Sequence, residues 1–97
     1  MDALDSEMIG FDLNLLITLA VVYREKSVSQ AAGHLRVSQP AVSNALRKLR
    51  GLFNDELFIR SNGEFLITAK CEQFMSQVEP AIISIQAALR ESLKQRG

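Results

Sequence analysis

The chain has 97 residues, 47% of them hydrophobic, and its 11 basic and 11 acidic residues leave no net charge. This length and composition predict one packed globular domain and exclude a disordered chain. The single cysteine excludes an internal disulfide, and with the only histidine it makes too small a set for a zinc site. The longest apolar run, Leu15 to Tyr23, is too short to span a membrane, and the acidic N-terminus does not resemble a secretory signal. We therefore expect a cytoplasmic protein.

The charges are distributed unevenly along the chain. Residues 1–23 hold four acidic residues and no basic one, whereas residues 24–60 hold seven basic residues and three acidic ones. For binding to a charged partner, this local distribution matters more than the sum. The basic middle of the chain also contains the motif described below.

Two helices are predicted first. Asp12 is a typical N-cap residue, and Ser27, followed three residues later by Gln30, forms a capping-box pattern. The apolar residues that follow Asp12 recur at helical spacings: Leu13, Leu16, Leu19, Ala20 and Tyr23. In the second helix Ala31, Ala32 and Leu35 are expected to face inward. The small alanines favour a close helix crossing. No glycine eases the turn that follows, which Arg36 and Val37 occupy.

A third helix is predicted over residues 38–53. Ser38 can cap it, and Pro40 falls in its first turn, where the missing N–H costs little. At 100° per residue one face is apolar and consists of Val42, Leu46, Leu49 and Phe53. The opposite face consists of Gln39, Pro40, Ser43, Asn44, Arg47 and Arg50, which suit the edges of DNA bases and phosphates. Two short helices joined by a tight turn form a helix-turn-helix.

A β-hairpin is predicted next. Two β-prone runs, residues 57–60 and 64–67, flank Asn62 and Gly63, which suit a type I′ turn with positive φ at both central positions. A hairpin that follows the third helix of such a motif is a wing.

The last predicted element is a long helix capped by Thr68. Its apolar residues alternate spacings of four and three, as in a coiled-coil seam: Cys71, Met75, Val78, Ile82, Ile85 and Leu89. Pro80 is expected to bend this helix without ending it. The seam can pack back on its own domain or on a second chain. Because the first three helices have enough mutual apolar surface, we favour dimerisation through Met75, Val78, Ile82, Ile85 and Leu89, with Cys71 as a small buried side chain.

Residues 11–70 resemble the N-terminal region of LysR-type transcriptional regulators. The matching segments are 11–16, 27–32, 37–43, 49–53 and 57–60, followed by Thr68. The resemblance implies a mainly α fold: a winged helix-turn-helix over residues 1–67, with a three-helix core and a two-stranded wing, and a dimerising linker helix over residues 68–97. It also implies a C-terminal effector-binding domain that this chain lacks, so we expect a fragment of a longer protein. A small-molecule effector is expected for that longer protein, and no cofactor for this chain.

Two residues depart from the family pattern. Ile67 stands where the family usually has a proline before the threonine that opens the linker helix, which extends the second wing strand. Asn44 stands where an arginine is common. This second departure removes the family's usual arginine–base contact at the position and leaves an asparagine–adenine contact open.

The predicted DNA contacts fall into two groups. Base contacts are assigned to exposed residues of the third helix: Gln39, Pro40, Ala41, Ser43, Asn44 and Arg47, with Arg47 reaching either a base or a phosphate. Contacts with phosphates or through the wing are assigned to Ser29, Arg36, Lys48, Arg50 and Arg60. For Lys48 and Arg50 a merely solvated charge is an alternative of nearly equal weight. Arg60 either enters the minor groove or pairs with Asp55 or Glu56.

These features predict a bacterial, nucleoid-associated transcription regulator that binds double-stranded DNA. A homodimer would read an imperfect inverted repeat through the helix 38–53 in the major groove, with the wings on the flanking minor groove. The full-length protein would form a dimer or tetramer, with RNA polymerase as a further partner. The rival interpretation is a protein-interaction module, which gives no reason for basic residues to gather around the turn. No nucleophile and base stand together, so we do not expect an enzyme, and we expect no metal or membrane site.

Overall fold

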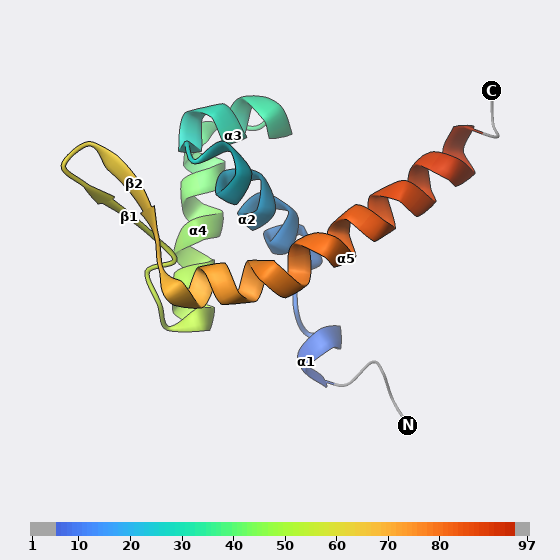
Figure 1. Ribbon diagram of the computed structural model, residues 1–97, viewed down its shortest axis with the longest axis horizontal. Coiled ribbons are helices and arrows are strands. Elements are labelled where there is room, and N and C mark those ends of the chain that lie inside the picture. Colours follow the sequence, from blue (N-terminus) through green and yellow to red (C-terminus); the bar gives the residue numbers. More distant parts are fainter. Residues whose placement is uncertain (1–5, 95–97) are drawn as a thin grey trace. The chain divides into compact units, whose positions relative to one another are not determined.

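The computed structural model describes residues 6–94, so Asp2 and Asp5 of the acidic segment lie outside the described residues. Its elements, in chain order, are α1 (Ser6–Ile9), α2 (Leu13–Glu25), α3 (Val28–Leu35), α4 (Gln39–Phe53), β1 (Phe58–Ser61), β2 (Glu64–Ile67) and α5 (Ala69–Leu93) (Figure 1). Three helices, a two-stranded wing and a long last helix confirm the predicted winged helix-turn-helix class. The short α1 was not predicted from the sequence.

The chain divides into two compact units, residues 1–49 and 50–97, and each is described by itself. The division groups the hairpin with α5, whereas the family pattern groups it with the helix-turn-helix. The boundary between residues 67 and 68 therefore stays a prediction.

The first unit is built around α2, α3 and the first part of α4. Its buried residues are Leu19, Ala20, Val22, Ala31, Ala32, Val42, Leu46 and Leu49. The predicted inward face of α4 is confirmed over residues 42–49, and α3 buries both alanines where it packs against α2. In α2 the buried residues are Leu19, Ala20 and Val22, whereas Leu13, which belongs to the spacing pattern, is 51% exposed. Because α2 is apolar on nearly every side, spacing alone does not single out one inward face.

The predicted helix caps are all present. In each case a side-chain oxygen accepts a hydrogen bond from a backbone N–H of the first turn, at 3.0 to 3.2 Å, and so supplies an acceptor that the helix itself cannot provide. The four capping residues are Asp12, Ser27, Ser38 and Thr68. The starts of α2 to α5 therefore follow directly from local sequence.

The hairpin of the second unit has the predicted turn. β1 and β2 are antiparallel, with Ser61 opposite Glu64, so that Asn62 and Gly63 form the two-residue turn. Their φ angles of 53° and 78° are those that a type I′ turn requires. On the strands, the rings of Phe58 and Phe65 lie 5.2 Å apart.

A network of hydrogen bonds joins the loop before the hairpin to the start of α5. Asp55 Oδ2 accepts from the Leu57 backbone N–H at 2.9 Å and from the Thr68 hydroxyl at 2.6 Å. The hydrogen bond from Thr68, followed by that from Leu57, lowers the pKa of the Asp55 carboxyl below its usual value. Asn54 and Leu57 adopt positive φ angles in this loop. The hydrogen bond to Asp55 therefore helps to hold Leu57 in a backbone conformation that side chains other than glycine disfavour.

The long helix α5 continues through Pro80, as predicted. In Figure 1 its first and second halves run in different directions, as expected where a proline removes a backbone hydrogen bond. Near its start Cys71 and Met75 are buried, and the Phe74 ring meets Phe53 edge-on at 4.8 Å. None of the described helices is long and apolar enough to cross a membrane.

Candidate nucleic-acid interface

The turn between α3 and α4 is made without glycine, as predicted. Arg36 ends α3 with a φ angle of 60°, in the left-handed region. The N–H of Val37 then bonds to the Ala32 carbonyl at 3.0 Å, and Ser38 caps α4. This backbone conformation is unfavourable for arginine, so α3 tolerates a local strain where an exposed guanidinium is placed.

The exposed face of α4 consists of the residues predicted to contact bases. All six are exposed: Gln39, Pro40, Ala41, Ser43, Asn44 and Arg47. The Ser38 hydroxyl, in contrast, is occupied by the Ala41 N–H at 3.2 Å. Because buried residues of α4 anchor the opposite side, the polar face is presented on a rigid helix.

Two of these residues are joined to each other. The Nη1 atom of Arg47 donates a hydrogen bond to Oδ1 of Asn44, with the two atoms 2.6 Å apart. Residues three apart lie side by side on a helix, which places both side chains on the same exposed face. The sequence pattern predicts a DNA contact for each of the two residues and does not indicate the hydrogen bond between them.

The predicted phosphate contacts differ in their surroundings. Ser29, Arg36 and Lys48 are exposed, and the Ser29 hydroxyl lies 3.2 Å from that of Ser27. Arg50, in contrast, donates from Nε to the Glu56 carbonyl at 2.8 Å and lies 3.9 Å from the Glu56 carboxylate. Arg50 is therefore held by the loop that follows α4, and the alternative of a free solvated charge does not describe it.

The wing carries Arg60 on β1, where it is exposed. The sequence left open whether Arg60 pairs with Asp55 or Glu56. Asp55 instead binds Thr68 and Leu57, and Glu56 lies beside Arg50. Within residues 6–94 no acidic partner of Arg60 is found, so its guanidinium is available to a ligand of the wing.

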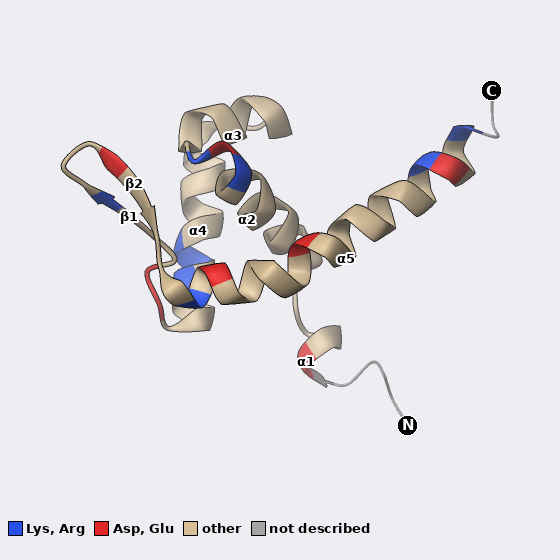
Figure 2. Ribbon diagram, viewed as in Figure 1, with Lys and Arg blue, Asp and Glu red and all other residues tan. Residues whose placement is uncertain are grey.

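Charge divides α4 into two parts (Figure 2). Residues 37–46 carry no charge, whereas Arg47, Lys48 and Arg50 form a basic band later in the helix. A neutral polar segment suits hydrogen bonding to base edges, and a basic band suits phosphates.

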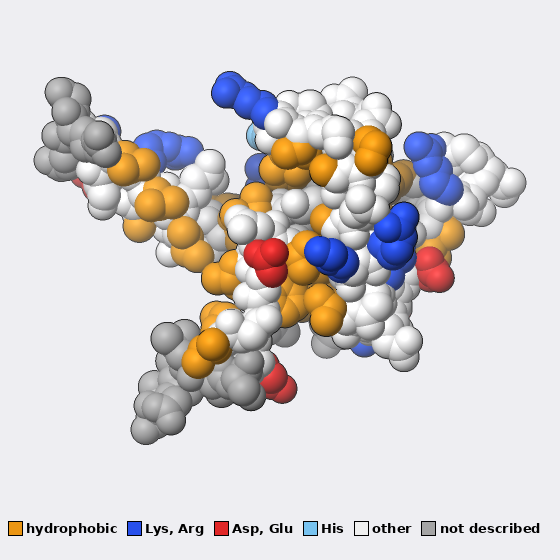
Figure 3. Space-filling model, turned by 180° about the vertical axis from the view of Figure 1, so that it is seen from behind, with side chains coloured by type: hydrophobic (Ala, Val, Ile, Leu, Met, Phe, Trp, Pro, Cys, Tyr) orange, Lys and Arg blue, Asp and Glu red, His pale blue; other side chains and the backbone are white. Residues whose placement is uncertain are grey.

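The predicted seam of α5 is covered only in part. Met75 is fully buried in its own chain, which corrects its assignment as a dimer contact. Val78 and Ile82 are half-buried, while Ile85 and Leu89 are 61% and 54% exposed. Every residue from 83 to 94 is exposed, and apolar side chains follow this half of α5 (Figure 3). The seam therefore packs inward at its start and is uncovered toward its end.

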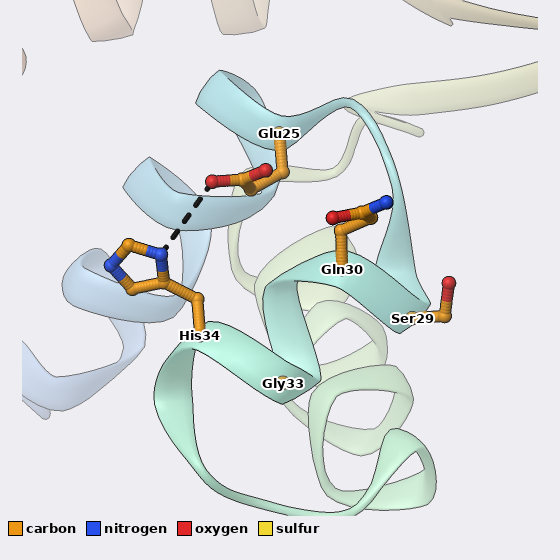
Figure 4. A pocket seen from close by; sticks show the side chains of 5 residues that line it. All are labelled: Glu25, Ser29, Gln30, Gly33 and His34. Atoms are coloured by element: carbon orange, nitrogen blue, oxygen red, sulfur yellow. Dashed lines mark ion pairs between the residues drawn. The ribbon is translucent and has the colours of Figure 1, made fainter.

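A second polar cluster lies where α2 meets α3. His34 Nδ1 is 3.6 Å from Glu25 Oε2, and both line an open pocket with Ser29, Gln30 and Gly33 (Figure 4). His34 is exposed, as predicted, but the sequence did not indicate its acidic neighbour. Among the described residues no three side chains of metal-ligating type come together.

Cys71 is the small buried side chain that the sequence predicts. Burial, with the charges of Glu72 and Asp55, raises the pKa of its thiol to about 11. A thiol of this pKa is almost entirely protonated at neutral pH, so Cys71 is a poor nucleophile.

Comparison with known proteins identifies the family of this chain. The family model described as a bacterial regulatory helix-turn-helix protein of the LysR family matches residues 13–72. Nodulation protein D 1 of Mesorhizobium japonicum is 40% identical over 80 residues, which are 82% of this chain and 26% of that protein. The HTH-type transcriptional regulator SyrM 1 of Sinorhizobium fredii is 37% identical over 86 residues, which are 89% of this chain and 25% of that protein.

Solved structures agree on the fold. A probable transcriptional regulator from Pseudomonas aeruginosa superposes with a TM-score of 0.81 and 34% identity, over 87% of this chain and 28% of its own. The DNA-binding domain of BenM, solved as a complex with DNA, superposes with a TM-score of 0.73 over 89% of this chain and 92% of its own; at 19% identity this likeness shows the fold. The chain spans about a quarter of the length of the curated relatives it matches. The family model, SyrM 1 and the Pseudomonas aeruginosa protein are each described as regulators, in agreement with the prediction of a regulator.

Proposed function

Because this chain belongs to the LysR family of bacterial regulatory helix-turn-helix proteins, we propose that it binds double-stranded DNA sequence-specifically through α4. The observation that carries this proposal is the exposed face of α4. It presents neutral hydrogen-bonding side chains beside a basic band, on a helix anchored by buried residues. A helix with such a face fits the major groove, where each base pair shows a distinct pattern of donors and acceptors.

The contacts divide by chemistry. Gln39, Ser43 and Asn44 are the proposed base-reading residues, since amide and hydroxyl groups match base edges. Lys48 and Arg36 are exposed cations and are proposed to bind phosphates, which position the protein without reading sequence.

The wing extends the proposed interface. Arg60 has no acidic partner among residues 6–94, and the tight turn at Asn62 and Gly63 makes a narrow tip. We infer that this hairpin touches the minor groove, where arginine is favoured.

We further propose that the chain acts as a homodimer on an imperfect inverted repeat. Support comes from the apolar residues that α5 leaves uncovered, chiefly Ile85 and Leu89 with the half-buried Val78 and Ile82. A two-fold dimer requires a site of matching symmetry. For the longer protein that the relatives represent, the family implies a small-molecule effector, a dimer or tetramer, and RNA polymerase as a further partner.

Binding of labelled duplexes at several salt concentrations tests the proposal. We expect Gln39→Ala to relax specificity at one or two base pairs, by about 1–3 kcal/mol, because a base contact is lost. Lys48→Ala should weaken binding to all sequences alike and reduce the slope of log affinity against log salt by about one.

Two results of these binding experiments would refute the proposals. If the unaltered chain shows no preference for any duplex over random DNA at moderate salt, sequence-specific binding is refuted. Equal effects of the two substitutions on selected and random DNA would refute the division between base and phosphate contacts.

A further inference from the structure

We propose that Asn44 and Arg47 form one reading unit that selects a guanine, in which Asn44 positions the guanidinium of Arg47. The inference rests on the proposed DNA binding and adds a base preference to it. It also replaces the asparagine–adenine contact that the sequence had left open.

The geometry of the pair identifies the atoms involved. Arg47 Nη1 lies 2.6 Å from Asn44 Oδ1, and both side chains are exposed on α4. A guanidinium has five N–H donors and no acceptor, so the Asn44 atom that faces it must be the amide oxygen. The amide nitrogen of Asn44 consequently points away from Arg47.

This arrangement changes what the two residues offer to DNA. Reading adenine requires the asparagine oxygen to accept from the N6 amino group while the amide nitrogen donates to N7. Here the oxygen already accepts from a cation, whose positive charge repels the hydrogens of an adenine amino group. What remains is a set of donors, the amide nitrogen of Asn44 and the Nε and Nη2 groups of Arg47. A pair of this kind is poorly suited to adenine.

Guanine presents the complementary edge. Its N7 and O6 atoms are both acceptors in the major groove, and a bidentate arginine–guanine contact is the commonest specific contact in protein–DNA complexes. The Nε and Nη2 edge of Arg47 is not used by Asn44 and can make this contact. Arg47 and Asn44 therefore both offer hydrogen-bond donors to a base edge whose N7 and O6 atoms are acceptors.

The surroundings of the pair favour this use of Arg47. Residues 37–46 carry no charge, so α4 offers no carboxylate that would compete with Asn44 for the guanidinium. Arginine otherwise loses considerable side-chain entropy when a contact fixes it. A hydrogen bond to a neighbour on the same helix face restrains the side chain before DNA arrives, which preserves part of the binding free energy.

The test uses the 97-residue chain and a duplex selected from a random pool. Each guanine of a selected half-site is replaced in turn by 7-deazaguanine, which keeps base pairing and loses the N7 acceptor. At one position we expect the replacement to weaken binding of the unaltered chain about ten-fold, within the range for a bidentate contact. For Arg47→Ala the same replacement should have almost no effect, and for Asn44→Ala an effect of about two- to three-fold.

Three further variants separate positioning from direct reading. Asn44→Asp keeps an oxygen facing Arg47 but has no amide donor, so its total affinity should fall while most of the ten-fold sensitivity to 7-deazaguanine is retained. Arg90→Ala removes an exposed cation of α5, outside the proposed contacts, and should keep the full sensitivity. In the double variant Asn44→Ala and Arg47→Ala, the sensitivity should equal that of Arg47→Ala alone. Circular dichroism checks that each variant is folded.

The possible failures are distinguishable. A selection that yields no consensus refutes sequence-specific binding and this inference with it. A consensus in which an adenine contact depends on Asn44 and not on Arg47 leaves the proposed function intact and overturns the pair. Independent, additive effects of the two alanine substitutions on guanine recognition overturn it as well.

Discussion

The hydroxyl of Thr68 makes two hydrogen bonds, and removing it should destabilise the second unit. Its oxygen accepts from the Cys71 N–H at 3.1 Å, as the cap of α5, and its hydrogen is donated to Asp55 at 2.6 Å. Thr68→Val removes the hydroxyl and keeps the shape. The backbone at Thr68 is extended, which valine adopts readily.

The expected magnitude follows from these two contacts. A typical intramolecular hydrogen bond contributes about 1 kcal/mol, so two lost bonds should lower the free energy of unfolding by about 2 kcal/mol. For a chain of this size, that loss corresponds to a fall in melting temperature of about 10 °C. The Ser27 hydroxyl caps α3, and its second contact is the exposed, neutral hydroxyl of Ser29, so Ser27→Ala should cost about 1 kcal/mol and serves as a control without a carboxylate.

The pH dependence of stability provides a second test, and the direction of the expected change follows from the pKa of Asp55. In the folded chain the pKa of Asp55 lies below its ordinary value of 3.8, chiefly because Thr68 donates to it. A carboxyl with a lowered folded pKa contributes stability above its unfolded pKa and loses it as the pH falls through its folded pKa. The difference in free energy of unfolding between the unaltered chain and Thr68→Val should therefore be constant from pH 7 to about 5 and become smaller below about pH 4.

Urea denaturation followed by circular dichroism, repeated at several pH values, measures both effects. For Ser27→Ala, the difference in free energy of unfolding from the unaltered chain should not become smaller at acidic pH. If Thr68→Val costs no more than Ser27→Ala, and its difference from the unaltered chain is the same at pH 3 and pH 7, the role assigned to the network around Asp55 is wrong.

Three further predictions concern other parts of the chain. Arg36→Gly should raise the free energy of unfolding by about 0.5–1 kcal/mol, because glycine accepts the left-handed backbone at this turn. The same change should lower affinity for every DNA sequence alike. Stability measured by urea denaturation should therefore rise while affinity measured by duplex titration falls. Leu89→Asp should weaken self-association at least ten-fold in sedimentation equilibrium with circular dichroism unchanged, since Leu89 is 54% exposed in the single chain; unchanged association would count against the seam. Cys71, with its pKa raised to about 11, should react slowly with a disulfide reagent at pH 8 and rapidly once urea unfolds the chain, whereas fast reaction in native buffer would contradict its burial.

Features that depend on neighbouring residues were predictable from the sequence. The helix caps and the turn at Asn62 and Gly63 involve residues within three positions of each other, so the residue types alone specify the hydrogen bonds or the φ angles. The inward face of α4 was also predictable because that helix has one apolar and one polar side. In α2, apolar residues surround the helix, and the buried side depends on how α3 packs against it.

Spacing in α5 identified residues that share a face, but it did not reveal what covers them. Met75 and Leu89 belong to the same seam, yet one is buried in its own chain and the other is exposed. The contact between Asp55 and Thr68 joins residues thirteen positions apart, through a loop with two positive φ angles. Such contacts depend on the path of the loop, for which the sequence carried no distinct signal.

The pair at Asn44 and Arg47 could have been found from the sequence, since residues three apart on a helix are neighbours. It was missed because each residue was matched separately to a base. Considered together, they change the meaning of the departure from the family at position 44. Arginine at that position would set two like charges side by side, and Arg47 would lose its acceptor. The base preference of this chain therefore depends on both positions jointly, and a relative with arginine at position 44 is expected to read a different sequence even where its residue at position 47 is the same.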